Sequence, residues 1–174
     1  TGRDPDFSKF IEYHPKSILV VPAFNKTTAA DAPLLFQSTI TAPLAERGYY
    51  VLPVWLTGEI LADLGITDEG LLEEIPPQRF HEVFGADTIL YVTILDWTTT
   101  YVILSSSVSV KARYRLVNAK TGEEIWIDAN EVVHVPQAQQ AGHPLVYIIG
   151  TLIQSALATA VDYRPLASQM NQSV

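Results

Sequence analysis

The pattern of apolar and polar residues in the first third of the chain predicts a strand, then a helix, then a second strand. Residues 17–22 form a short, continuous apolar run, which is typical of a strand buried on both faces. Residues 31–47 have apolar positions at helical spacing and a proline in the first turn, and Gly48 fits the left-handed position that closes a helix. A second strand is predicted to follow at once, over residues 49–54.

The middle of the chain predicts two helices followed by three strands. The helices are expected over residues 55–65 and 76–84, and the strongest strand over residues 87–97, which should be central in the sheet. Thr98–Thr100 is predicted to turn the chain into residues 101–117, where even positions are apolar and odd positions are polar. A hairpin turn at residues 118–122 leads into the last strand, over residues 123–135.

The alternating strand sets the expected register of this last hairpin. Placing Leu116 opposite Ile125 puts Arg113 opposite Asp128, so that the charges pair on the polar face. The predicted polar face then carries a basic stripe and a tryptophan, namely Lys111, Arg113, Arg115 and Trp126.

Together these elements predict an α/β (α+β) domain with a mixed parallel and antiparallel five-stranded sheet, in the order β-α-β-α-α-β-β-β-α. The last helix is expected from Pro144 to about Val161. The predicted boundaries are an N-terminal arm at residues 1–16 that links to a lipid anchor, a single domain at residues 17–161 and a C-terminal tail at residues 162–174.

Composition narrows the function classes. The chain has 174 residues, enough for one domain with its own core, and its net charge of -8 argues against nucleic acid as a partner. The chain has no cysteine, which excludes disulfides, thiolate catalysis and cysteine-bound zinc. The first residues have no signal-peptide pattern, so we expect a soluble fragment cut after any export signal.

Candidate chemistry is sparse. Four histidines lack the spacing of a zinc motif, and the nucleophile-elbow, dinucleotide and phosphate-loop motifs are missing. Lys120-Thr121-Gly122 matches a triplet of serine β-lactamases, but a hairpin turn explains it better. The acidic residues between positions 63 and 74 are better explained as a solvated surface than as a calcium site. We therefore predict no catalytic residue, no cofactor and no metal.

Partner contact is the remaining role for individual residues. Arginine and tryptophan are enriched at interface hot spots, so the stripe of Lys111, Arg113 and Arg115 with Trp126 is a candidate contact surface, although a solvated, neutralised sheet face is the simpler interpretation. Tyr49 and Tyr50 point to opposite faces of their strand, so one is expected in the core and the other is a candidate contact.

Several blocks of this chain resemble a known family. They are residues 18–25, residues 43–51 with the sequence from Pro43 to Val51 as the most specific part, residues 84–87, and residues 120–123 with Trp126. Over about residues 15–135 the chain is similar to the bacterial lipoproteins designated domain of unknown function 799. That family is related in fold to the curli-secretion lipoprotein, the N-terminal domain of the Tol-Pal translocation protein and the lipoprotein that activates a penicillin-binding protein.

The resemblance implies an exported protein, acylated on an N-terminal cysteine and tethered to the periplasmic face of the outer membrane. The expected function is a non-catalytic interaction or assembly module of the cell envelope that binds a protein partner and touches the membrane only through its anchor. An alternative is an oligomeric subunit of a secretion pore like the curli-secretion lipoprotein, although the predicted connection at Thr98–Thr100 is too short for inserted hairpins. A small-ligand binder or hydrolase is a weaker alternative.

Overall fold

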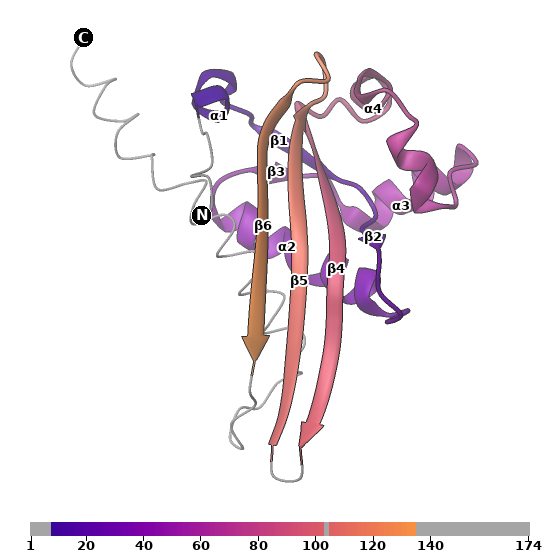
Figure 1. Ribbon diagram of the computed structural model, residues 1–174. Coiled ribbons are helices and arrows are strands. Elements are labelled where there is room, and N and C mark those ends of the chain that lie inside the picture. Colours follow the sequence, from indigo (N-terminus) through magenta and orange to yellow (C-terminus); the bar gives the residue numbers. More distant parts are fainter. Residues whose placement is uncertain (1–7, 103–104, 135–174) are drawn as a thin grey trace, which may run out of the picture.

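The computed structural model describes residues 8–102 and 105–134 of the chain. One mixed sheet organises this part of the protein, with strands in the spatial order β3-β1-β4-β5-β6 (Figure 1). The three early strands pair in parallel, and β4, β5 and β6 form an antiparallel meander. This arrangement confirms the predicted mixed α/β fold. The strands are β1 (Ser17–Val20), β2 (Phe24–Asn25), β3 (Tyr50–Val51), β4 (Thr88–Val102), β5 (Ser105–Asn118) and β6 (Glu124–His134).

Helices cover both faces of the early strands. The helical elements are α1 (Ser8–Tyr13), α2 (Ala32–Glu46), α3 (Val54–Asp63), the 3₁₀ helix η1 (Glu69–Glu73) and α4 (Pro77–Phe84). Three elements were not predicted: α1, η1 and β2, which pairs with β4 beyond the end of β1 and makes the sheet six-stranded. The predicted helix from Pro144 to Val161 lies outside the described residues.

Strand β1 explains how one sheet supports two cores. Ile18 and Val20 point into a core with α2, and Leu19 and Val21 point into a second core with α3, η1 and α4. Because side chains alternate along a strand, a continuous apolar run lines both cores at once. The prediction of a strand buried on both faces is therefore confirmed.

Helix α2 packs against the sheet through residues spaced one helical turn apart. Phe36, Ile40 and Leu44 are almost completely buried, and each such side chain contributes roughly 1.5–3 kcal/mol of hydrophobic stabilisation. The helix ends as predicted, because Gly48 has φ 86° and its N–H donates to the Ala45 carbonyl at 2.9 Å. The backbone then enters β3, which is shorter than the predicted strand.

The predicted turn at Thr98–Thr100 is wrong. Strand β4 runs through these residues to Val102 and pairs with β5 up to the Val102–Ser105 pair. The paired ends of β4 and β5 extend well past the helices as a long ribbon (Figure 1). Threonine is as common in strands as in turns, and no glycine, proline or asparagine marks a turn at this point.

Candidate functional site

The helices α3 and α4, with η1 between them, form a lobe over the β1 and β4 side of the sheet. This acidic lobe, residues 54–84, contains an open groove of about 280 Å³. Helix α4 is held between Pro77 in its first turn and Gly85, whose φ of 68° ends it, so Phe80 and Phe84 project on one side with ring centroids 6.5 Å apart. The groove is lined by Leu61, Leu64, Ile66, Ile75, Arg79, Phe80, Val83 and Phe84.

Large apolar side chains of the lobe are exposed. Trp55 is 69% exposed, and two residues of the groove, Leu64 and Val83, are 57% and 44% exposed. Clustered exposed apolar residues mark binding surfaces more often than scattered ones do. This surface was not predicted from the sequence. The sequence of α3 could have indicated an exposed apolar surface, because this helix has more apolar residues than one buried face requires.

Charge is concentrated on the same lobe. Residues 54–84 contain seven acidic side chains, and the lobe's one lysine or arginine is Arg79, which pairs with Glu82 at 2.7 Å. Asp63, Glu74 and Glu82 are exposed and each directly adjoins a groove residue in the sequence. The groove is therefore apolar inside and flanked by negative charge.

The basic stripe lies on the open part of the same sheet face. No labelled helix crosses β5 and β6 on the side opposite α2 (Figure 1). Lys111 and Arg113 are exposed, while Arg115 is half-buried with its guanidinium 4.6 Å from the centre of the Tyr91 ring. Burial raises the pKa of Tyr91, and the neighbouring Arg115 partly opposes the rise.

The neighbours of the stripe differ from those predicted. Arg113 stands opposite Thr93 on one side and Ala129 on the other, so the expected pairing with Asp128 is wrong. Arg115 stands opposite Ile127, which is 48% exposed. The open face therefore presents an apolar side chain beside two arginines.

Trp126 does not share this face. Leu116 pairs with Trp126 instead of Ile125, because an irregularity between Leu116 and Val117 adds one residue to β6. Both Ile125 and Trp126 consequently point into the α2 core, where the Trp126 ring lies 6.3 Å from that of Tyr114. Trp126 is buried, so the predicted grouping of this residue with the stripe is corrected.

Tyr49, just before β3, and Tyr50, its first residue, lie in different environments, as predicted. Tyr49 packs against the α2 core, and Tyr50 is 66% exposed at the β3 edge of the sheet. Tyr50 is remote in strand order from the stripe on β5, so the structure does not bring all the candidate contacts together.

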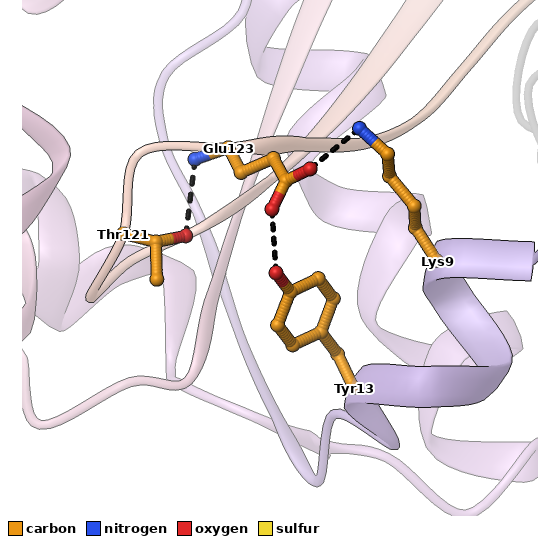
Figure 2. Close-up of polar contacts among 4 residues, drawn as sticks. All are labelled: Lys9, Tyr13, Thr121 and Glu123. Atoms are coloured by element: carbon orange, nitrogen blue, oxygen red, sulfur yellow. Dashed lines mark hydrogen bonds and ion pairs between the residues drawn. The ribbon is translucent and has the colours of Figure 1, made fainter.

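A polar cluster fixes α1 to the far end of the sheet. Glu123 lies just before β6, and its carboxylate accepts a hydrogen bond from the Tyr13 hydroxyl at 2.5 Å (Figure 2). The same carboxylate forms an ion pair with the Lys9 ammonium at 2.5 Å. The bonds from Lys9 and Tyr13 lower the pKa of Glu123, and the bond to Glu123 raises the pKa of Tyr13. The Glu123 N–H donates to the Thr121 hydroxyl, which orients the carboxylate toward α1.

The Lys120-Thr121-Gly122 triplet is a turn. The Asn118 side chain accepts hydrogen bonds from the N–H groups of Lys120 and Thr121, and Gly122 has φ 76°. These bonds hold the connection between β5 and β6 and confirm the hairpin interpretation. In the described part of the chain, histidine and acidic side chains nowhere gather in a set of three that could hold a metal.

Within the described residues, two buried polar atoms on the α2 side have no hydrogen-bond partner. They are the Tyr114 hydroxyl and the Trp126 indole N–H. Burial strongly raises the pKa of Tyr114, with a smaller contribution from Asp128. Among the described helices, none is both long and apolar enough to cross a bilayer.

The comparison with known proteins identifies the lineage of this fold. Residues 5–173 match the family described as "Putative lipoprotein GNA1162-like". The chain belongs to this lipoprotein family. A relative from Neisseria meningitidis serogroup B, the lipoprotein NMB1124/NMB1162, is 37% identical over 123 residues, which are 71% of this chain and 57% of the relative. The match thus spans little more than half the length of that curated relative.

Solved structures agree with the family. The crystal structure of lipoprotein GNA1162 from Neisseria meningitidis is 30% identical, with a TM-score of 0.68 over 83% of this chain and 99% of that chain. The PelC dodecamer from Paraburkholderia phytofirmans has a TM-score of 0.57 at 15% identity, over 84% of this chain and 88% of that chain. The second likeness concerns the fold alone.

These findings confirm that the chain belongs to a lipoprotein family, and such a family implies a membrane-anchored location in the cell envelope. The relatives' names contain no enzyme activity. The designation domain of unknown function 799 stays a prediction. So do the fold relations to the curli-secretion lipoprotein, the N-terminal domain of the Tol-Pal translocation protein and the lipoprotein that activates a penicillin-binding protein.

Proposed function

We propose that this domain is a non-catalytic interaction and assembly module that binds a protein partner at the periplasmic face of the outer membrane, where an N-terminal lipid tethers it. Membership of a lipoprotein family supports the tether, and the surface of the acidic lobe supports the protein partner. Nucleic acid is not a proposed partner, because a net charge of -8 opposes phosphate binding.

The observation that carries the proposal is the exposed apolar groove between α3 and α4. A ligand or catalytic pocket needs polar groups that converge on a reacting or bound atom. Here the lining is apolar apart from Arg79, and the Arg79 guanidinium is paired with Glu82. Such a surface suits the side chains of a protein better than a small polar substrate, so a small-ligand binder or hydrolase is the weakest alternative.

Site-specific photo-crosslinking in cells tests this function. A photoreactive residue is placed in the anchored protein at Val83 in the groove, at Arg113 on the open sheet face or at Tyr50 on the β3 edge. Ser38, an exposed residue of α2, is the matched control position. We expect a reproducible envelope-protein adduct from at least one of the first three positions and none from Ser38. Equal, unspecific labelling at all four positions would overturn the proposal.

A subunit of an oligomeric secretion pore is the second candidate. The ribbon formed by β4 and β5 favours it, because these strands continue through Thr98–Thr100 and remove the objection of a short connection. The fold likeness to PelC, which is a dodecamer, is compatible with it. The anchored protein should then form rings in detergent and resist extraction from membranes as integral proteins do. Failure of both tests excludes this candidate.

A further inference from the structure

Two unlike surfaces of this chain carry opposite charges beside exposed apolar side chains. The groove of the acidic lobe is an apolar hollow flanked by Asp63 and Glu74. The open face of β5 and β6 presents Ile127 beside Arg113 and Arg115. We propose that the acidic lobe of one copy docks on the open sheet face of a second copy, with Ile127 directed into the groove.

Charge distribution supports a second copy as the occupant. Residues 54–84 carry seven acidic and one basic residue, whereas β5 has three basic and no acidic residues. Lys111 stands opposite Asp96 on β4 and Glu131 on β6, so Arg113 and Arg115 carry the basic charge of the proposed contact. A chain with a net charge of -8 repels itself in most orientations. The lobe-to-sheet orientation is the one that brings opposite charges together, so electrostatics selects it over the alternatives.

The apolar parts of the two surfaces also match. Leu64 and Val83 leave the groove open to solvent, and Ile127 is an apolar side chain that the described residues, 8–102 and 105–134, leave 48% exposed. Burying these residues against each other removes apolar surface from water. Arg113 has neutral cross-strand neighbours, Thr93 and Ala129, which leaves its guanidinium available to a carboxylate from another molecule.

The contact is head-to-tail, because the two surfaces differ. A head-to-tail contact leaves one lobe and one sheet face unused at the ends, so it continues into a ring or a filament. Lipid anchoring confines copies to one surface and raises their effective concentration, which favours a contact that is weak in solution. This inference rests on the proposed function and names its partner.

Charge exchange in the 174-residue chain tests the contact. The sheet variant is Arg113→Glu with Arg115→Glu, and the lobe variant is Asp63→Arg with Glu74→Arg. Sedimentation velocity over a range of protein concentrations at low salt is expected to show self-association of the unmodified chain. Each variant alone should associate about tenfold more weakly or not at all, because like charges then face each other. Circular dichroism checks that both variants fold.

Restoration is the decisive outcome. A mixture of the sheet and lobe variants should associate again, as should a chain that carries all four substitutions. The control, Lys26→Glu with Lys120→Glu, makes the same change in net charge as the sheet variant but outside the stripe, and should associate like the unmodified chain. A monomeric unmodified chain, or variants that associate normally, would overturn the inference. A hetero-partner captured from Val83 in cells would then still support the proposed function.

Discussion

The Tyr13 hydroxyl donates a hydrogen bond of 2.5 Å to the carboxylate of Glu123, 110 residues later in the chain. Tyr13 lies on α1, in the segment predicted as an arm, and Glu123 lies at the turn before the edge strand β6 (Figure 2). Lys9 adds a second contact to the same carboxylate. The segment expected to lead to the lipid anchor is thus attached at the β6 edge of the sheet.

Replacing Tyr13 with phenylalanine should loosen α1 without disturbing the rest of the domain. Phenylalanine keeps the ring that packs against the α2 core and removes only the hydroxyl that binds Glu123. Hydrogen exchange should become faster in residues 8–13, with little change in β4 and β5. Glu12→Gln, on the exposed side of the same helix, is the control and should exchange like the unmodified chain. Unchanged exchange in the Tyr13 variant would show that packing alone holds α1.

The docking of α1 should also depend on pH. The two bonds lower the pKa of Glu123 in the folded protein below its ordinary value of 4.5. A lowered folded pKa stabilises the docked state above the ordinary value, and this contribution is lost as the pH falls through the folded pKa. The protection of α1, measured as its exchange rate relative to the intrinsic amide rate at each pH, should therefore fall below about pH 4.5.

A Glu123→Gln variant isolates this effect. Its α1 should exchange fast at neutral pH and show no further acid step of its own. Asp87 is a second carboxyl group whose protonation in acid costs stability, because its pKa is also lowered. Burial opposes its ionisation, but hydrogen bonds from the Lys16 and Ser17 N–H groups and the Ser17 hydroxyl hold its pKa low. An acid step of equal size in the Glu123 variant would assign the transition to Asp87 or to the whole domain.

Gly48 should resist substitution although it lies on the surface. Its φ of 86° is unfavourable for any residue with a Cβ, so Gly48→Ala is expected to lower the free energy of unfolding by about 1 kcal/mol. Gly58 is the matched control, because it lies inside α3 with no atom within 4 Å of an added Cβ. Gly58→Ala should raise the free energy of unfolding by up to about 1 kcal/mol. Urea unfolding of both variants measures the difference, and equal effects would contradict the αL assignment.

The sequence predicted the longer helices and strands of residues 17–134 and most of their buried faces, because periodicity reports both. It did not predict the short elements α1, β2 and η1. The alternation along β5 correctly assigned Tyr114 to the core and Arg113 to the open face. The pairing of β5 with β6 was wrong by one residue, since an added residue near Ile125 places both Ile125 and Trp126 in the core. Such a bulge leaves no signature in a simple alternation pattern.

The candidate surface depended on tertiary placement that periodicity does not contain. The basic stripe was predicted because its residues lie on one strand. The groove was not predicted, because its lining comes from α3, α4 and the connections between them. The local pattern does not indicate that Leu64 and Val83 stay exposed in the folded protein. The acidic residues beside the groove were recognised, but only as a solvated surface.

The Tyr114 hydroxyl provides a last test of how the α2 core is built. It is buried without a hydrogen-bond partner, while its ring packs between Phe36 and Trp126 at centroid distances of 6.1 and 6.3 Å. Removing a buried, unpartnered polar atom relieves its desolvation cost, so Tyr114→Phe should leave stability unchanged or raise it by about 1 kcal/mol. Tyr114→Ala removes the ring as well and should lower stability by about 3–5 kcal/mol. Urea unfolding at neutral pH measures both variants. A clear loss of stability in Tyr114→Phe would mean that the hydroxyl has a partner in solution, such as a buried water, and that this core is polar at its centre.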